Sequence, residues 1–244
     1  VRRQKVRRRL WTGVTLLGVL TACQPVEPPP PEPDSGLTGD YLGSSVCYTC
    51  HARTHNEWIG TAHARAFTTI QELGQDQNPV CLGCHVTGYG KAGGYVDPIT
   101  TQSLASIGCE ACHGPSRAHR ENVADKTLRP PVNIASEVCS QCHNSYHHEN
   151  YSEWASSRHG RVTPSLATSF TDGRSLNSCG TCHSGDFRHA SIIQGQADIP
   201  DTMLEGVAPE DMNAVTCAIC HDPHANTGND PTAPAGHDWQ LRYP

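Results

Sequence analysis

The feature that most constrains this chain is a short motif, Cys-x-x-Cys-His, which occurs six times in 244 residues. The motifs hold twelve of the thirteen cysteines, and Cys23 near the N-terminus is the other one. An odd number of cysteines excludes a fully paired disulfide framework. The six copies are Cys47/Cys50/His51, Cys81/Cys84/His85, Cys109/Cys112/His113, Cys139/Cys142/His143, Cys179/Cys182/His183 and Cys217/Cys220/His221.

This motif predicts covalent attachment of c-type heme. Its two cysteines form thioether bonds to the porphyrin vinyl groups, and the adjacent histidine reaches the iron as the proximal ligand. Structural zinc is the alternative, but zinc ribbons use Cys-x-x-Cys pairs without a histidine after every pair. All six pairs here are followed by histidine. We therefore expect six heme c groups, with the motif histidines as proximal ligands.

The composition agrees with buried cofactors. Hydrophobic residues make up 36% of the chain, and there are only three phenylalanines and two methionines. An ordinary domain is about 45–50% apolar, so we expect the porphyrins to supply much of the core. The predicted fold class is mostly irregular and α, with short helices that carry the motifs, loops wrapped around six c-type hemes, and little or no sheet.

The N-terminal residues resemble an export signal. Six basic side chains lie within the first nine residues, and the apolar run Leu10–Leu20 precedes Thr21-Ala22-Cys23. This order is typical of a signal peptide, and the last four residues resemble the lipobox of bacterial lipoproteins. We expect a lipoprotein signal at 1–22 and lipidation of Cys23. A short membrane anchor and an unprocessed thiol are the alternatives.

Residues 23–40 are expected to form a lipidated, proline-rich linker, since six of the nine residues from 25 to 33 are proline. The predicted location is the periplasmic face, or the outer surface, of a bacterial outer membrane. Without 1–22 the chain keeps 12 Lys and Arg against 24 Asp and Glu, a net charge of −12. That balance argues against nucleic acid as a partner and suits redox proteins.

Nine histidines lie outside the motifs and could bind iron from the distal side. Each of them could equally be a solvated surface residue. Met203 and Met212 are the only thioethers, and we favour histidine over methionine as distal ligand. The candidate distal ligands are His63, His119, His159, His224, His189 and His148, and His55, His147 and His237 make up the nine.

The chain contains an internal repeat. Glu57-Trp58 and His63 follow the first motif, and Glu153-Trp154 and His159 follow the fourth, with the same spacing within each Glu-Trp-x-x-x-x-His segment. Each segment is followed by two further motifs. We expect two three-heme units, 41–134 and 135–244, related by duplication, with His63 and His159 in equivalent roles. Chance similarity is the alternative.

Four segments resemble the tetraheme cytochrome c-554 family. The resemblance covers about residues 41–150, a four-heme region, and leaves 151–244 as a two-heme C-terminal extension. The long loop after the second motif makes the likeness specific to that family. The segments are Val46–His51 with Glu57–Ala64, Cys81–Tyr95, Ile107–Pro115 and Val138–Tyr146.

The resemblance implies closely spaced pairs of hemes that pass electrons. It implies that His63 is the distal ligand of the third heme and that His119 ligates the first. It also implies that the heme on His85 lacks a distal protein ligand. By duplication the fifth heme would also lack a distal protein ligand, although His189 could occupy that position. For the fourth heme the candidates are His224, His147 and His148.

These features predict an electron-carrying cytochrome whose partners are a quinol-oxidising membrane complex, other cytochromes and a terminal reductase. The alternative is an enzyme that reduces or oxidises a small nitrogen or sulfur species at an open heme on His85, assisted by Arg65, Arg117 or Lys91. Every motif ends in histidine, so the Cys-x-x-Cys-Lys motif of pentaheme nitrite reductases is absent. A third possibility is a heme filament subunit, although a lipid anchor on each subunit argues against it.

Overall fold

The computed structural model describes residues 39–144, 149–227 and 240–242, which belong to a single unit of the chain. The predictions for Cys23, His147, His148 and His237 concern positions outside these described residues. The signal and linker predictions fall mostly outside them as well. None of the helices in the described part is long and apolar enough to cross a membrane.

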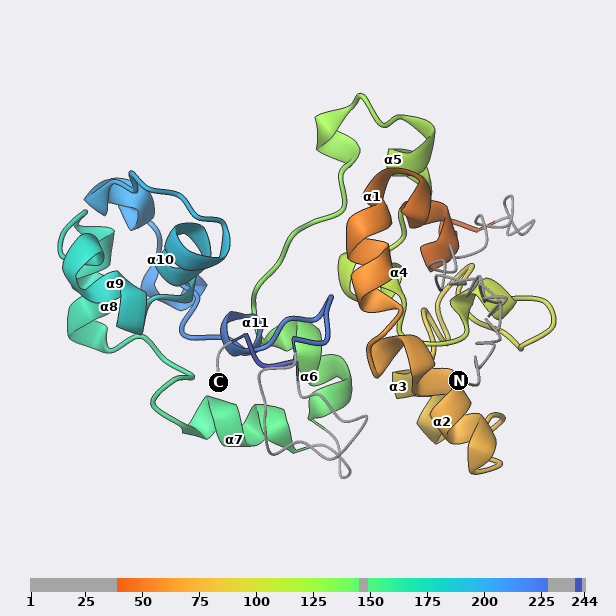
Figure 1. The fold of residues 1–244 in the computed structure, drawn as a ribbon. Helices are drawn as coiled ribbons and strands as arrows, with labels where there is room; N and C mark the ends of the chain where they lie inside the picture. The colour runs from red at the N-terminus through yellow and green to blue at the C-terminus, as the bar shows by residue number, and fades with distance from the viewer. Residues whose placement is uncertain (1–38, 145–148, 228–239, 243–244) are drawn as a thin grey trace, which may run out of the picture. The chain divides into compact units, whose positions relative to one another are not determined.

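Short helices separated by irregular loops make up the described residues, as predicted (Figure 1). In these residues, pairing between extended segments is confined to isolated bridges, such as the one between Val86 and Ala105. Both cysteines of every motif lie on a helix, and the six motif helices are α1, α3, α4, α6, α9 and α11. The bounds are α1 Ser44–Trp58, α2 Ala66–Glu72, α3 Pro79–His85, α4 Cys109–His113, α5 Arg117–Glu121, α6 Glu137–His143, α7 Asn150–Ser156, α8 Pro164–Thr171, α9 Leu176–His183, α10 Gly185–Arg188 and α11 Cys217–Cys220.

In the sixth motif a short helix carries both cysteines, as predicted, but the histidine lies just beyond it. Helix α11 ends at Cys220, and His221 has extended backbone angles, with φ −108° and ψ +143°. The reason is the C-terminal segment, because His221 forms an isolated antiparallel bridge with Leu241, and the N–H of Arg242 donates a 2.7 Å hydrogen bond to the carbonyl of Cys220.

Single turns of other helix types connect these elements. They are the 3₁₀ turns His63–Arg65, Gln102–Leu104, Lys126–Leu128, Asp201–Leu204 and Pro209–Asp211, and the π-helical turn His189–Ile193.

Local sequence explains why the motif helices are short. Helix α3 begins with Pro79, and the Asn78 side chain accepts a hydrogen bond of 3.0 Å from the backbone N–H of Val80. Helix α4 ends at His113 and is followed by Gly114, whose φ of +78° suits glycine. Helix α1 has a kink at His51, where φ is −113° and ψ is +38°. Helical geometry therefore stops at or near the histidine of these motifs.

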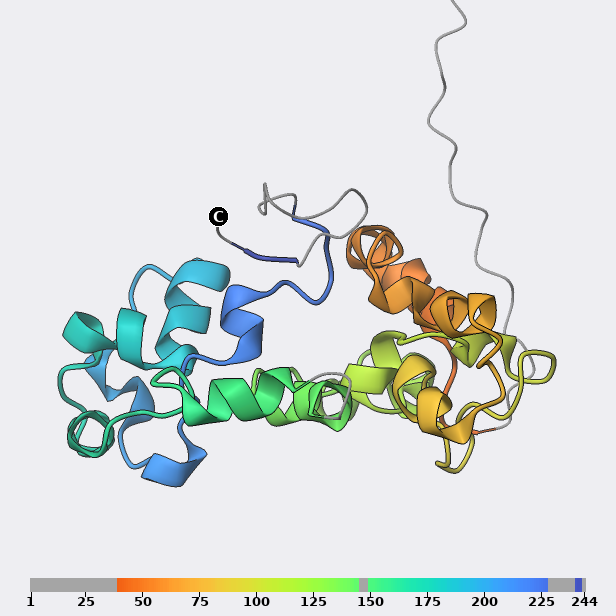
Figure 2. The same ribbon diagram turned by 90° about the horizontal axis from the view of Figure 1, so that it is seen from below.

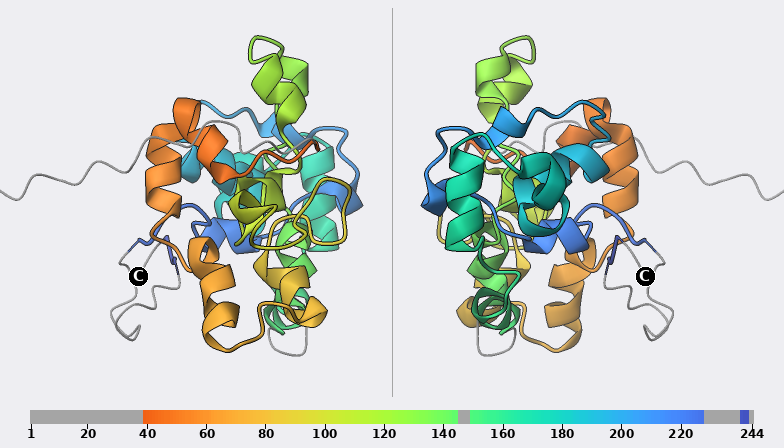
Figure 3. Two further views of the ribbon diagram at one scale, coloured as in Figure 1. Left: turned by 90° about the vertical axis from the view of Figure 1, so that its right-hand side faces the viewer. Right: turned by 90° about the vertical axis from the view of Figure 1, so that its left-hand side faces the viewer.

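Two small apolar clusters hold the described residues together. The first lies around α2 and α3, and the second lies around α8, α9 and α10, which gather into one group (Figure 3). Each is far smaller than the core of an ordinary domain of this length. The first contains Tyr41, Phe67, Ile70, Leu82, Val86, Tyr95 and Leu104, and the second contains Ala167, Phe170, Leu176, Phe187, Ala190, Ile199, Leu204 and Met212.

A tryptophan holds each half of the chain in the same way. The indole N–H of Trp58 donates a 3.1 Å hydrogen bond to the carbonyl of Ile107, and that of Trp154 donates a 2.8 Å bond to Val215. Next to these bonds, the N–H of Ile107 donates to the carbonyl of His63, and the N–H of Val215 donates to that of His159. Both of these distances are 3.1 Å.

A buried serine gives a second matched contact. The Ser44 hydroxyl accepts a 3.0 Å hydrogen bond from the backbone N–H of Cys109, and the Ser136 hydroxyl accepts one of the same length from Cys217. In each half, the contact joins the helix of the opening motif to the helix of the third motif. Helix α1 accordingly lies beside α4 in Figure 1. Helices α6 and α7 also lie next to one another (Figure 2).

Candidate heme-binding site

The motif cysteines meet in pairs that join different motifs. Cys47 is hydrogen-bonded to Cys109, which links the first and third motifs. Cys139 is hydrogen-bonded to Cys217, which links the fourth and sixth. Cys142 contacts Cys84 and so links the fourth and second. Cysteines that are far apart in the sequence therefore lie close together. The first and third motifs form one group, and the second, fourth and sixth form another.

These contacts perturb the free thiols strongly. Its hydrogen bond with Cys47 lowers the pKa of Cys109 to about 6, and its hydrogen bond with Cys139 lowers that of Cys217 to about 6. Burial and the neighbouring Cys84 raise the pKa of Cys142 to about 12. A lowered thiol pKa favours the nucleophilic thiolate before attachment, whereas a thioether sulfur no longer titrates.

A cavity of about 200 Å³ lies between several motifs. Residues of the first, third, fourth and sixth motifs line it, together with five histidines apart from His51 of the first motif. Its walls are therefore shared by segments that are far apart in the sequence. The five histidines are His55, His63, His113, His189 and His224.

Two motif histidines face a second histidine from elsewhere in the chain. The ring centres of His63 and His143 are 6.2 Å apart, with 76° between the ring planes. The ring centres of His113 and His224 are 6.1 Å apart, and their planes are parallel to within 5°. A metal–imidazole bond is about 2.0–2.1 Å long, so two rings that share one metal have centres roughly 6 Å apart. Both separations therefore fit one iron between two imidazoles.

This placement differs from what the family resemblance implied. The resemblance implied that His63 ligates the third heme, and His224 was a candidate for the fourth. The ring of His63 lies beside His143 of the fourth motif and that of His224 beside His113 of the third. The distal assignments stay predictions. The backbone explains the exchange. His63 lies at the end of the segment that Trp58 anchors, and α3, which follows this segment, packs against α6 of the fourth motif.

The facing histidines are suited to bind iron as neutral bases. Burial, followed by the nearby His143, lowers the pKa of His63. Burial also lowers the pKa of His224, against an opposing effect of Asp222. A lower pKa keeps the imidazole unprotonated near neutral pH, and only the unprotonated ring can donate a lone pair to a metal.

Two motif histidines are oriented by backbone carbonyls. Nδ1 of His85 lies 2.7 Å from the carbonyl oxygen of Ala66, and Nδ1 of His113 lies 2.9 Å from that of Pro131. A carbonyl can only accept, so Nδ1 carries the proton and Nε2 is left free for the iron. Metal-binding histidines commonly have such a partner, which fixes the ring orientation.

The histidines of the fifth and sixth motifs are both exposed but differ in their backbone setting. His183 is the last residue of α9, as the prediction of a helical motif requires. His221 lies beyond the end of α11 and is held by its backbone instead. Its N–H donates a 2.8 Å hydrogen bond to the carbonyl of Cys217, and its own carbonyl accepts a 3.1 Å bond from Arg242. The assignment of both residues as proximal ligands stays a prediction.

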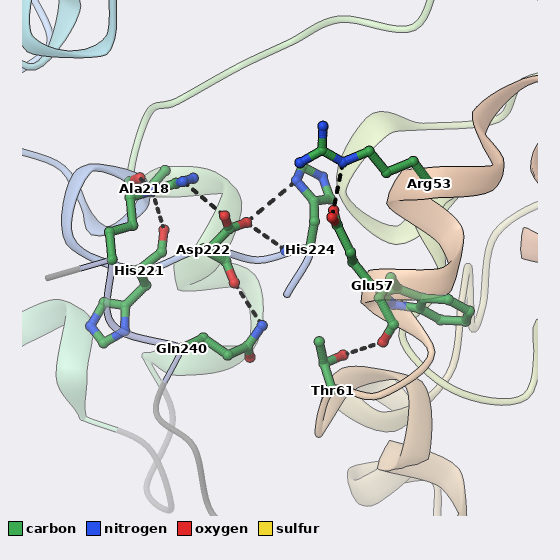
Figure 4. A network of polar contacts seen from close by, with 10 residues as sticks. Arg53, Glu57, Thr61, Ala218, His221, Asp222, His224 and Gln240 are labelled. Atoms are coloured by element: carbon green, nitrogen blue, oxygen red, sulfur yellow. Dashed lines mark hydrogen bonds and ion pairs between the residues drawn. The ribbon is translucent and has the colours of Figure 1, made fainter. Parts of the chain in front are cut away.

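Asp222, directly after the sixth motif, is the centre of a polar network beside His224 (Figure 4). One carboxylate oxygen accepts a 3.0 Å hydrogen bond from the backbone N–H of His224 and lies 3.7 Å from its Nδ1. The other oxygen pairs with Arg242 at 2.8 Å. Gln240 donates to the backbone carbonyl of Asp222 at 2.7 Å. The network therefore ties His224 to the C-terminal residues 240–242.

The other predicted distal ligands have different surroundings. Nδ1 of His119 is buried without a hydrogen-bond partner in the described residues. His189 lies in the shared cavity near Arg242 and Ala218 of the sixth motif. His159 is exposed. Of the two methionines, Met212 is buried in the second apolar cluster and Met203 is partly exposed.

Sequence reasoning missed three supporting residues. Ser44 and Ser136 each lie three residues before the first cysteine of a motif, a repetition visible in the sequence. Glu110 occupies a variable position of the third motif, yet its buried carboxylate accepts 2.8 Å hydrogen bonds from the N–H groups of Leu42, Gly43 and Ser116. Nothing in the sequence distinguishes this carboxylate from a solvated one.

Comparison with known proteins gives the same assignment for the N-terminal part. Residues 46–114 match the family model for cytochrome c554 and c-prime. Cytochrome c-554 of Nitrosomonas europaea is 30% identical over 139 residues, which is 43% of this chain and 58% of that protein. The chain thus matches just over half the length of this curated relative.

Two solved structures show a partial likeness. The undecaheme cytochrome from the S-layer of Carboxydothermus ferrireducens has a TM-score of 0.46 at 19% identity, covering 83% of this chain and 41% of that one. The outer cell wall cytochrome OcwA has a TM-score of 0.42 at 18% identity, covering 84% and 65% respectively. The family model, over residues 46–114, and the curated relative confirm the predicted resemblance to the cytochrome c-554 family.

Proposed function

We propose that this chain is an exported hexaheme c-type cytochrome that carries electrons between redox partners. The observation that carries the proposal is the pairing of motif histidines with histidines from other parts of the chain, His63 with His143 and His113 with His224. When bound, each heme c supplies an iron that alternates between ferric and ferrous states. Histidines on both sides leave no open position for a substrate at these two sites.

The cysteine contacts support a chain of neighbouring attachment sites. The first motif contacts the third, and the fourth contacts both the second and the sixth. Cys112 of the third motif lies close enough to Cys139 and Cys142 of the fourth to raise their pKa values. The attachment sites are thereby ordered as first, third and fourth, with the second and sixth beside the fourth. Such closeness suits transfer from one site to the next.

The distal ligands follow from the ring pairs. We assign His63 to the fourth heme and His224 to the third, and retain His119, His189, His159 and His148 as candidates for the others. The matched contacts of Trp58 and Trp154, and of Ser44 and Ser136, support the duplication of a three-heme unit. In this proposal the units are 41–134 and 135–244.

Location and partners are proposed from the sequence. The basic N-terminus, the apolar run and Cys23 support export and a lipid anchor, on the periplasmic face or outer surface of the outer membrane. The net charge of −12 without the signal favours basic docking surfaces on partner proteins. A quinol-oxidising membrane complex, other cytochromes or a terminal reductase would be suitable partners.

The proposal can be tested on the oxidised holoprotein. Intact mass should show six attached hemes, and EPR should show low-spin signals for the third and fourth. His63→Ala should convert one low-spin signal to high-spin. High-spin signals from both sites in the unaltered protein would refute the pairing on which the proposal rests.

Cyanide or nitric oxide distinguishes the carrier from the enzyme. If added ligand binds one heme, and removal of the second motif cysteines abolishes that binding, the alternative gains support. That alternative is reduction or oxidation of a small nitrogen or sulfur species at an open heme on His85. A carrier with every heme saturated should show no ligand uptake.

A further inference from the structure

His159 has the same backbone setting as His63. The carbonyl of each accepts a 3.1 Å hydrogen bond from the segment before the third motif of its half. Each follows a tryptophan whose indole donates to that same segment. Thr61 and Ser157, at matching positions, donate side-chain hydrogen bonds to their respective tryptophan carbonyls at 2.8 and 2.7 Å. The two histidines are therefore structural equivalents.

The role of His63 defines what His159 is equipped to do. His63 faces the histidine of the fourth motif, which opens the second half of the chain. Helix α3 packs against α6 of the same motif, and Cys84 contacts Cys142 there. The first half therefore supplies a distal histidine, His63, and a motif helix, α3, to the fourth motif, which opens the second half.

The corresponding surface of the second half is exposed. His159 is exposed to solvent, whereas its equivalent His63 is half-buried and faces His143. Cys182 of the fifth motif, the equivalent of Cys84, is also exposed, whereas Cys84 is half-buried against Cys142. The second half thus presents the same pair of groups to its surroundings.

The first motif is suited to occupy this surface. It opens the first half as the fourth motif opens the second, with Ser44 and Cys47 matching Ser136 and Cys139 in their contacts. Its Cys50 and His51 are exposed. A donor on one half and an acceptor of the matching type on the other are complementary, so one copy can dock on a second copy. Lipid-anchored copies in one membrane can make this contact side by side, which differs from the extended filament that an anchor disfavours.

We propose that His159 is the distal ligand of the first heme in a second copy of this chain. The inference rests on the proposed heme attachment. The His159 imidazole nitrogen donates its lone pair to that iron, while Cys182 and α9 lie against the first motif of the neighbour. His119 is the competing ligand, because the family resemblance assigns it to the first heme within the same copy.

The test compares three variants of the full-length holoprotein in detergent, His159→Ala, His119→Ala and the control Arg158→Gln. Arg158 is a neighbour of His159 in the chain and lies outside the shared contacts. Association is measured by sedimentation velocity over a dilution series, and the high-spin fraction by EPR on the same samples. Intact mass is determined for every sample.

The unaltered protein and Arg158→Gln should associate at high concentration, and dilution should convert one heme from low-spin to high-spin. His159→Ala should lose the association and keep one heme high-spin at every concentration, and added imidazole should return that heme to low-spin. Association of His159→Ala equal to that of the control would overturn the inference. So would a new high-spin heme in His119→Ala and none in His159→Ala.

The mass measurement separates this inference from the proposed function. Fewer than six hemes in the unaltered protein would contradict the six-heme assignment itself. Six hemes in a protein that remains monomeric at all concentrations would contradict only the role of His159.

Discussion

The buried carboxylate of Glu110 gives the sharpest test of how the third motif is held. It is 2% exposed and accepts hydrogen bonds from the N–H groups of Leu42, Gly43 and Ser116, all at 2.8 Å. These bonds fasten the chain just before α1 to the helix of the third motif. Glu110→Ala would remove both acceptor oxygens, and with them all three hydrogen bonds, and leave the N–H groups of the buried Leu42 and Gly43 without a partner.

Glu110→Ala should cause a large loss in the free energy of unfolding. Each buried N–H left without an acceptor costs about 1–3 kcal/mol, and hydrogen bonds to a charged acceptor are at the upper end of that range. Two buried donors and one partly buried donor give a loss of about 3–6 kcal/mol in the free energy of unfolding. Since domains are typically stable by about 5–15 kcal/mol, Glu110→Ala should remove a large part of the total.

The assay is unfolding of the oxidised holoprotein in guanidinium chloride, followed by far-UV circular dichroism. Glu110→Gln keeps one acceptor oxygen and should lose roughly half as much as Glu110→Ala. Glu121→Gln is the matched control, because Glu121 is an exposed partner of Arg117 at 3.7 Å, and such pairs contribute about 0–1 kcal/mol. If Glu110→Ala stays within about 0.5 kcal/mol of the unaltered protein, the proposed fastening is wrong.

Three further predictions concern the repeat and the iron ligands. Trp58→Phe and Trp154→Phe should each lower the free energy of unfolding by about 1 kcal/mol in the same assay; a loss in only one would contradict equivalence of the two halves. His63→Ala should create a heme that binds cyanide, monitored by the Soret band, whereas unchanged cyanide binding would contradict its pairing with the fourth motif. Asp222→Asn should weaken the hold on His224 and shift the EPR signal and reduction potential of the third heme by altering the distal ring; an unchanged signal would show that the carboxylate does not position that ring.

Most of the motif helices could be predicted from the sequence because their signal is local. The motif spacing, Pro79 and Gly114 indicate where a helix begins or ends without reference to the rest of the chain. His221 is the exception, since the bridge to Leu241 that draws it out of α11 comes from a distant segment. The contacts of Trp58 and Trp154 could not be predicted either, because their acceptors are backbone carbonyls of distant segments, which no side chain identifies in the sequence.

The pairing of histidines could not be predicted in this way. The sequence around a histidine does not indicate which iron it faces. The ring beside His63 is that of His143, in the fourth motif rather than the third. The family resemblance implies the third heme for His63, whereas the ring contact favours the fourth, so the distal assignment stays a prediction. The deciding factor is the packing of α3 against α6, which depends on contacts between distant segments.

The two halves share the serine and tryptophan contacts but differ in the hydrogen bonds that hold the third motif of each unit. In the first half, Glu110 accepts hydrogen bonds from the segment that leads into α1. Ala218 stands at the matching position of the sixth motif and has no side-chain acceptor. There the backbone carbonyl of Ala218 accepts a 3.0 Å hydrogen bond from Arg242, which also pairs with Asp222.

The difference between Glu110 and Ala218 matches the hydrogen-bond donors that lie beside each motif. Glu110 supplies oxygens because the segment beside the third motif, residues 42 and 43, presents backbone N–H groups. The sixth motif is flanked instead by Arg242, a side-chain donor, so a carbonyl and the carboxylate of Asp222 are the suitable acceptors. The repeated contacts of serine and tryptophan thus build the heme-binding frame, while the unrepeated acidic residues adapt each unit to the neighbouring chain segment.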